Sequence, residues 1–213
     1  MKSINVIRTF VSGSLFLLLL AGCAGDPQST SAPTGSAPSS EVIAADQSQP
    51  TWETQEYEDT YLSYEIPAGW KKHENSSDDM RLTLFTPQEP TTDMPSNVCV
   101  QILSLQSQSK DFDYADPEIQ ELYHQFLISS DSGLTAEAQD GEYATEQIGD
   151  TWVYSISFAR EAEDGTMVQQ TGYFPMGLDY TLAIWATDYK DGCTPPVEEI
   201  AKHICETLCI LEP

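Results

Sequence analysis

Four stretches of alternating side chains between residues 142 and 186 constrain the fold of this chain most strongly. In the stretch 152–158, aromatic and aliphatic residues at even positions alternate with Val and Ser at odd positions, as in a strand with two different faces. Short turn sequences join the stretches, among them Asp164-Gly165, a strong tight-turn signal. The sequence therefore predicts an antiparallel meander of four strands, 142–148, 152–158, 167–174 and 180–186.

Three more strands are predicted before the meander. In the stretch 61–66, Leu62, Tyr64 and Ile66 share one face, and Pro67-Ala68-Gly69 turns the chain before Trp70. Residues 80–85 alternate again, and a proline-rich loop over 86–97 separates them from a third strand at 98–102.

Two helices are predicted, one between the two groups of strands and one after the meander. Asp116 can cap the first helix, Pro117 suits its first position, and the apolar stripe is Ile119, Leu122, Tyr123, Phe126 and Leu127. The second helix opens at Thr194-Pro195-Pro196, with an inward stripe of Val197, Ile200, Ala201, Ile204 and Leu208. This order predicts an α+β fold, an antiparallel sheet of about six to seven strands with helices packed on it.

The N-terminus is typical of an export signal. Lys2 and Arg8 precede an apolar run that is shorter than the roughly 20 residues a spanning helix needs. The run ends in Leu20-Ala21-Gly22-Cys23, which resembles the cleavage and lipidation box of bacterial lipoproteins. That resemblance implies cleavage after Gly22 and attachment of fatty acyl chains such as palmitate to Cys23. An ordinary secretory signal and an uncleaved anchor are the alternatives.

The expected domains are a signal peptide over 1–22, a lipidated Cys with a disordered linker over 23–50, and an α+β domain over 51–213. The linker is rich in Ser, Thr, Pro and Ala and cannot bury enough apolar surface to fold. Its length of about 27 residues gives a mean reach of roughly 30 Å.

The chain is strongly acidic. It carries 34 Asp and Glu against 9 Lys and Arg, a formal charge of −25. Loss of residues 1–22 removes two bases and no acids, which leaves 34 against 7, or −27. The remaining bases are scattered, whereas a phosphate-binding surface needs clustered Lys and Arg, so nucleic acid is excluded as a partner. Anionic lipid headgroups should also repel the domain.

Four cysteines follow Cys23: Cys99, Cys193, Cys205 and Cys209. An exported protein can form disulfides, and four cysteines allow three pairings. Cys193 and Cys205 lie at opposite ends of a predicted helix and are too far apart to pair. The pairing of the others is left open.

No catalytic or metal-binding motif stands out. His73, predicted in a polar run, and His124 and His203, predicted on the outer faces of the two helices, have no evident orienting partner. Asp111, Asp113 and Asp116 begin like a calcium loop, but the central Gly and the closing Glu are missing. His203, Cys205 and Cys209 match no zinc spacing. We expect no catalytic residue, metal ligand or cofactor.

Aromatic residues supply the candidate ligand site. Core packing of sheets against helices explains most of them. The alternative is a groove that accepts a sugar, peptide or lipid, lined by Trp70, Trp152, Tyr173 and Trp185, with Gln169 and Gln170 as polar contacts.

The strand that ends in Ile66-Pro67-Ala68-Gly69-Trp70, the mid-chain helix, the meander and the closing amphipathic helix together resemble the PsbP/DcrB-like domain over residues 51–208. The resemblance implies an α/β/α sandwich of a kind that recurs in bacterial lipoproteins, usually without catalytic machinery. It transfers no catalytic residue, and the photosystem association of plant relatives does not follow from it.

These observations lead us to expect a lipid-anchored, extracytoplasmic lipoprotein of the cell membrane. It would act as a non-catalytic binding or accessory module of the cell envelope, with an unknown envelope protein or small ligand as its partner. The alternatives are an envelope enzyme of unrecognised type and a ligand-capturing lipoprotein that serves a transporter. A single domain of about 160 residues disfavours the two-lobed form of the latter.

Overall fold

The computed structural model describes residues 50–77, 80–90, 92, 94–104, 112–129, 134–162 and 164–211. They belong to one compact unit, residues 47–213. The predicted signal peptide, the box Leu20-Ala21-Gly22-Cys23 and the linker up to residue 49 lie outside the described residues and stay predictions. Within the described part of the chain, every helix is too short or too polar to cross a membrane.

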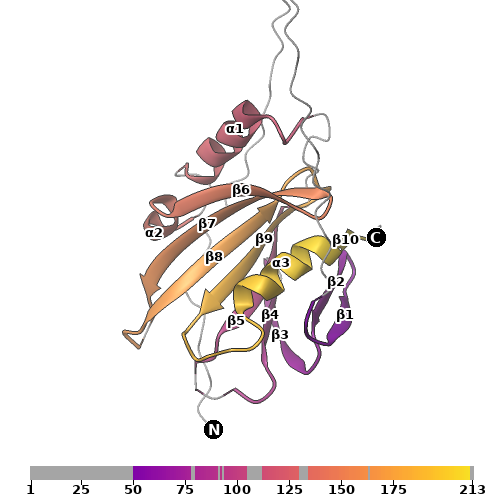
Figure 1. The fold of residues 1–213 in the computed structure, drawn as a ribbon, viewed down its shortest axis with the longest axis vertical. Coiled ribbons are helices and arrows are strands. Elements are labelled where there is room, and N and C mark those ends of the chain that lie inside the picture. The colour runs from indigo at the N-terminus through magenta and orange to yellow at the C-terminus, as the bar shows by residue number, and fades with distance from the viewer. Residues whose placement is uncertain are drawn as a thin grey trace, which may run out of the picture. The chain divides into compact units, whose positions relative to one another are not determined.

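Seven antiparallel strands form the main sheet, in the order β3-β4-β5-β9-β8-β7-β6 (Figure 1). The predicted meander is its β6 to β9 half, and β9 joins this half to β5. The strands are β3 (Trp70–Ser77), β4 (Met80–Pro87), β5 (Asn97–Ser104), β6 (Glu142–Ile148), β7 (Thr151–Glu161), β8 (Met167–Pro175) and β9 (Thr181–Asp188).

The turn between β7 and β8 shows why the meander could be predicted locally. Gly165 has a positive φ of 84°, a conformation that glycine adopts without steric cost. The carboxylate of Asp164 accepts a hydrogen bond from the backbone N–H of Thr166 at 2.9 Å. The glycine conformation and the hydrogen bond both involve residues of the turn itself, so the turn is specified by its own sequence.

A second sheet has three strands in the order β1-β2-β10: β1 (Thr54–Glu58), β2 (Leu62–Pro67) and β10 (Cys209–Ile210). The central strand β2 buries Leu62, Tyr64 and Ile66, the three residues that the alternation placed on one face. After β2 the chain turns at Gly69, whose φ is +81°, and enters β3 at Trp70.

One face of the main sheet is covered by the small sheet and by helix α3 (Val197–Thr207). The predicted stripe of α3 lies in this core: Val197, Ile200, Ala201 and Ile204 are buried and Leu208 is half-buried. Full burial of each aliphatic side chain stabilises the fold by about 1.5–3 kcal/mol. The stripe therefore fixes how α3 lies on the sheet.

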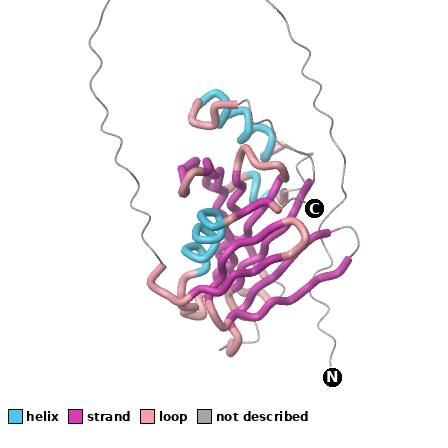
Figure 2. Tube along the Cα trace, turned by 90° about the vertical axis from the view of Figure 1, so that its right-hand side faces the viewer, coloured by secondary structure: helices cyan, strands magenta, loops and turns pink. Residues whose placement is uncertain are grey.

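The opposite face of the main sheet carries a second, smaller core. Tyr154, Ile156 and Phe158 of β7 form its centre, with Phe174 of β8. Two helices contribute one buried residue each, Leu127 from α1 (Pro117–Leu127) and Ala138 from α2 (Ala136–Gln139). In both Figure 1 and Figure 2, α1 lies at the top, above the strands.

The predicted fold class is confirmed, since an antiparallel seven-stranded sheet has helices packed on both of its faces. All seven predicted strands and both predicted helices are present. The sequence did not predict β1, β3, β10 and α2. These elements are short or lie at a sheet edge, and their sequences carry no apolar alternation.

Candidate functional site

Helix α1 begins as its sequence dictates. Asp116 has an extended backbone, and its carboxylate accepts a hydrogen bond from the N–H of Glu118 at 2.9 Å. Pro117 occupies the first turn, where it has no N–H to leave unpaired. The acidic Glu118 in that turn favours the positive end of the helix dipole.

The apolar stripe of α1 faces the sheet with only part of its residues. Leu127 is the one buried residue of this helix, whereas Leu122 is 64% and Phe126 45% exposed. At 3.6 residues per turn, the sheet-facing residues Tyr123, His124 and Leu127 lie roughly a quarter of a turn from the centre of the stripe. We call the half-buried Ile119 and the exposed Leu122 and Phe126 the α1 stripe.

A cluster of aromatic rings holds α1 in this orientation. The imidazole of His124 stacks on Tyr143 of β6, with ring centroids 3.8 Å apart, and its Nδ1 hydrogen-bonds the hydroxyl of Tyr154 on β7. Tyr123 meets Tyr154 edge-on at 5.8 Å. The prediction that His124 lies on the outer face of the helix is therefore wrong. The helix packs on the sheet through residues at one side of its apolar stripe, and His124 is one of them.

Two tyrosines of the cluster keep their protons at physiological pH, because burial raises the pKa of Tyr154 and of Tyr123 well above the ordinary value of 10.0. The hydrogen bond between the Tyr154 hydroxyl and Nδ1 of His124, together with the stacking of Tyr143 on the imidazole, anchors α1 to the sheet.

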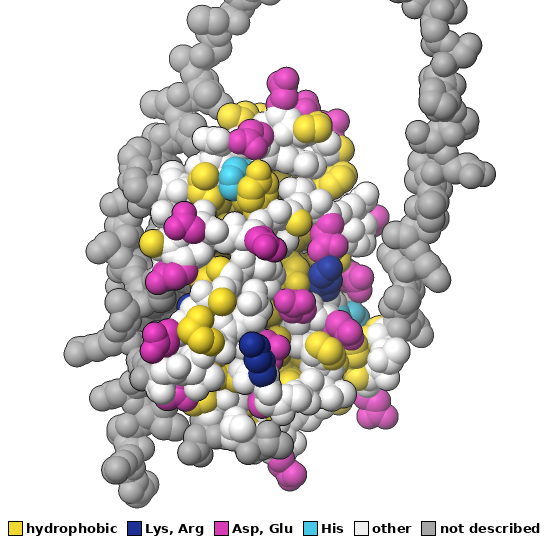
Figure 3. Space-filling view, turned by 60° about the vertical axis from the view of Figure 1, so that its left-hand side comes forward, with side chains coloured by type: hydrophobic (Ala, Val, Ile, Leu, Met, Phe, Trp, Pro, Cys, Tyr) yellow, Lys and Arg dark blue, Asp and Glu magenta, His cyan; other side chains and the backbone are white. Residues whose placement is uncertain are grey.

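The surroundings of the α1 stripe are acidic. The described segment 112–129 holds four acidic residues, Asp113, Asp116, Glu118 and Glu121, and no Lys or Arg. Glu118 and Glu121 are exposed and lie on the flank of Leu122, by helical spacing. Figure 3 shows one face of the domain, on which acidic side chains are spread among hydrophobic ones and basic side chains are few.

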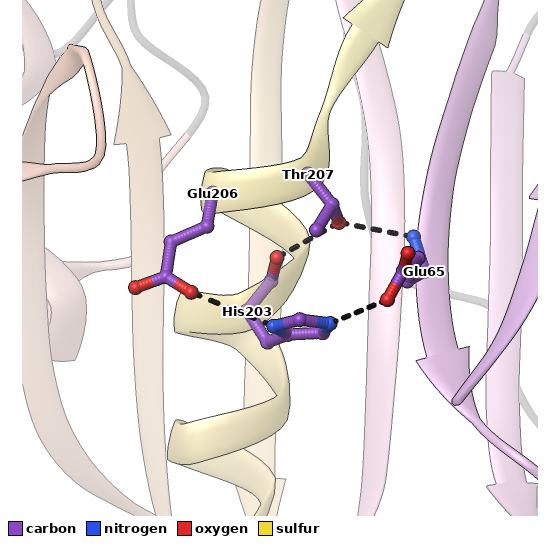
Figure 4. A network of polar contacts seen from close by, with 4 residues as sticks. All are labelled: Glu65, His203, Glu206 and Thr207. Atoms are coloured by element: carbon purple, nitrogen blue, oxygen red, sulfur yellow. Dashed lines mark hydrogen bonds and ion pairs between the residues drawn. The ribbon is translucent and has the colours of Figure 1, made fainter. Parts of the chain in front are cut away.

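A second polar arrangement lies between α3 and β2 (Figure 4). His203 of α3 places Nε2 at 3.0 Å from a carboxylate oxygen of Glu65 and Nδ1 at 3.5 Å from one of Glu206. The hydroxyl of Thr207 donates to the carbonyl of His203 at 2.9 Å and accepts the N–H of Glu65 at 3.0 Å. Both ring nitrogens of the buried His203 thus face the carboxylates of partly exposed glutamates.

The prediction that His203 lies on the outer face of its helix is also wrong. The residue is 7% exposed, because β2 and Trp52 cover the flank of α3 beside its apolar stripe. Hydrogen bonds from His203 and Thr54 hold the pKa of Glu65 below its usual value of 4.5. The network ties the end of α3 to β2.

An open hollow of about 480 Å³ adjoins this network and is lined by Pro50, Trp52, Glu53, Thr54 and Glu65. The indole N–H of Trp52 is buried without a hydrogen-bond partner. Four of its five lining residues are among the first described residues of the domain, and the fifth, Glu65, belongs to β2.

The four predicted groove residues are divided between the two cores. Trp70 and Tyr173 are buried in the core beneath α3, and Trp152 and Trp185 are half-buried against the core of the opposite face. The structure does not bring them together around one space, so a ligand role for them stays a prediction. Gln170 accepts a hydrogen bond from Arg160 and donates one to Thr187 within the sheet.

The other weighed residues have structural partners. His73 lies on β3 and hydrogen-bonds Thr86 at 2.8 Å. Asp113 accepts the N–H of Ala115 and Asp116 caps α1, while Asp111 lies outside the described residues. Cys99, Cys193, Cys205 and Cys209 are all free thiols, of which Cys209 is exposed. Among the described residues, no three His, Cys, Asp or Glu side chains are placed to share a metal ion.

Sequence reasoning found the residues of the α1 stripe but not their exposure. The stripe was visible as a periodic pattern, whereas its rotation depends on His124, Tyr143 and Tyr154, which meet only in the folded chain. The partner of His203, Glu65, is 138 residues away in sequence, and no local signal pointed to it.

No protein-family model matches the chain, and no curated protein sequence matches it. Three solved structures are similar in fold. A Bacteroides thetaiotaomicron protein is 14% identical, with a TM-score of 0.45, over 71% of this chain and 45% of that one, so this chain spans less than half of its length. The cyanobacterial PsbP (CyanoP) of Synechocystis sp. PCC 6803 is 10% identical, with a TM-score of 0.45, over 79% of this chain and 99% of that one.

The third structure is LpqN of Mycobacterium tuberculosis, a protein involved in cell envelope biogenesis. It is 14% identical, with a TM-score of 0.43, over 75% of this chain and 91% of that one. At these identities the similarities concern the fold alone.

Proposed function

We propose that this protein is a lipid-anchored, extracytoplasmic lipoprotein with a PsbP/DcrB-like domain that binds another component of the cell envelope without catalysing a reaction. The observation that carries the binding role is the α1 stripe. A helix of an isolated domain normally turns its apolar stripe to the core. Here the aromatic cluster fixes α1 so that Tyr123 and Leu127 face the sheet, whereas Leu122 and Phe126 of the same stripe are exposed.

The location rests on Leu20-Ala21-Gly22-Cys23, which resembles a lipoprotein box. Each buried methylene of an acyl chain contributes about 0.8 kcal/mol to membrane binding. Two long chains therefore anchor a protein stably, whereas one chain binds weakly and reversibly. The acidic, Ser- and Pro-rich sequence behind Cys23 then holds the domain away from anionic lipid.

The rings of His203 and His124 are both engaged by neighbouring side chains of the fold. A general base must be free to take a proton from a substrate. His203 faces carboxylates at both ring nitrogens, and His124 is hydrogen-bonded to Tyr154 under the stacked ring of Tyr143. Both imidazoles serve the fold.

Membrane attachment is tested with the variant Cys23→Ala in the natural host. The unaltered chain should fractionate with membranes and, by intact mass, begin at a diacylated Cys23. The variant should appear in the soluble fraction or as an uncut precursor. Membrane retention of a fully processed Cys23→Ala chain would contradict the anchor.

The binding role is tested separately by photo-crosslinking from exposed positions spread over the domain, such as Leu103, Leu122 and Met167. Repeated capture of one envelope protein from at least one position is expected. If illumination of the full chain in its host gave no protein adduct at any tested position, that result would contradict the binding role.

A further inference from the structure

We infer that the α1 stripe is the docking surface of this domain and that its occupant is a basic amphipathic helix of another protein. The inference rests on the proposed binding role and specifies its site and the chemistry of its partner. It is carried by the orientation of α1 and by the charge around the stripe.

The shape of the surface suits a helix. Leu122 and Phe126 are four residues apart, so they stand one above the other on the same side of α1, with Ile119 beside them. Such a row is a ridge that packs into the groove of a second helix. The row spans two turns, roughly 10 Å, which suits a short amphipathic helix with apolar anchors at matching spacing.

The negative charge around the α1 stripe favours a partner that carries positive charge. Glu118 and Glu121 flank Leu122, and segment 112–129 contains four acids without any Lys or Arg. Opposite charges at the rim of an interface speed association and reject partners of the wrong sign. A helix with Lys or Arg beside its apolar anchors therefore fits this rim.

The same charge argues against two other occupants. In a symmetric contact with a second copy, two surfaces that are acidic and without Lys or Arg would face each other, and each chain carries a net charge of −25. An anionic membrane surface would be repelled in the same way. Both occupants remain outcomes that the experiment can return.

The small size of the stripe implies a weak contact, below the area of standard stable interfaces. The tether compensates for this weakness. The anchor predicted at Cys23 would hold the domain at the same membrane as an envelope partner, which raises the effective concentration of that partner. A contact of low intrinsic affinity is then sufficient.

The first test measures binding of a synthetic peptide to the full mature chain purified from its host. The probe is a fluorescent 14-residue helix with Leu at helical spacing and Lys on the flanks, and its anisotropy reports binding. Leu122→Ser and Phe126→Ser should each weaken binding by about tenfold, as expected for a central apolar anchor. Met167→Ser, an equally exposed apolar residue that lies on β8, should leave it unchanged.

Two control peptides separate docking from simple charge attraction. A peptide with Glu in place of Lys and a peptide with Ser in place of Leu should both bind at least about tenfold more weakly than the probe. Equal binding of either control, or equal loss with Met167→Ser, would overturn the inference. Circular dichroism of each variant confirms that the fold is retained.

The second test places the photo-crosslinker at position 122 or 126 of the anchored chain in its host, with position 167 as the control. Mass spectrometry of the adduct should identify a Lys- or Arg-rich helical segment captured from 122 and 126 but not from 167. Capture of lipid, of a second copy or of an acidic segment would overturn the inference. Protein capture at 167 alone would overturn it while leaving the binding role intact, and absence of adducts everywhere would contradict both.

Discussion

Nε2 of His203 lies 3.0 Å from a carboxylate oxygen of Glu65, and this contact joins the last helix to the first predicted strand across 138 residues of sequence. His203 is buried, and Trp52 meets its ring edge-on at 5.9 Å. The pair therefore links β2, α3 and the first described residues of the domain. Stability should depend on it.

We expect His203→Ala to lower the free energy of unfolding by about 2–3 kcal/mol, since it removes a charge-assisted hydrogen bond and leaves a cavity beside Trp52. His203→Gln keeps a donor near Glu65 and should recover part of the loss. Lys202→Ala, on the same helix as His203, removes an exposed ion pair with Glu146 of β6 and should change stability by less than about 0.5 kcal/mol. Urea unfolding followed by tryptophan fluorescence measures all three; equal effects of His203→Ala and Lys202→Ala would refute the structural role.

The same pair predicts a pH dependence. Hydrogen bonds from His203 and Thr54 hold the pKa of Glu65 below 4.5 in the folded state. Ionised Glu65 therefore stabilises the fold above about pH 4.5, and this contribution is lost as the pH falls through the lowered folded pKa. The loss on Glu65→Gln should be largest near pH 6 and shrink towards pH 3. Its size is modest because the Glu65 side chain is 41% exposed.

The check is urea unfolding of both chains at several pH values between 3 and 6. Glu199→Gln removes an exposed carboxylate from the same pair of elements and serves as the matched control. A Glu65→Gln difference that stays constant across the range would show that the carboxylate is not stabilised by its partners.

The parts of the fold that were predictable are those fixed by local pattern. The meander follows from period-two alternation and from turns such as Asp164-Gly165, and α3 follows from its stripe at helical spacing. Strand β3 was missed because Lys71, Lys72 and His73 give an edge strand no apolar alternation, and β10 was missed because it has two residues.

The candidate site was not predictable for a different reason. A helical pattern gives the spacing of an apolar stripe but not how the helix is rotated about its axis relative to the sheet. That direction is decided by His124 against Tyr143 and Tyr154, and by β2 against the flank of α3 that carries His203. Both are contacts between elements far apart in sequence, and in each case the histidine on the flank was assigned to solvent.

The cysteines make a prediction about chemical reactivity. Burial raises the pKa of the Cys99 thiol to about 12 and that of Cys193 to about 11, whereas Cys209 is exposed on β10. The thiolate is the reactive species, so a Cys23→Ser chain should react rapidly with a thiol reagent at Cys209, slowly at the half-buried Cys193, and at the buried Cys99 and Cys205 only after unfolding. Cys209→Ser should abolish the rapid phase. Fewer than four thiols in the unfolded, unreduced chain would instead reveal a disulfide.

Gly172 of β8 and Trp185 of β9 form a cross-strand pair in which the indole lies over the glycine. A Cβ at position 172 would lie 2.5 Å from a ring atom of Trp185, far inside van der Waals contact. Gly172→Ala should therefore lower stability by about 1–3 kcal/mol through overpacking. In a Trp185→Leu background the ring is gone, and the same alanine should cost less than about 0.5 kcal/mol. A double-mutant cycle in urea measures the coupling, and additive effects of the two substitutions would show that the indole does not require the glycine beneath it.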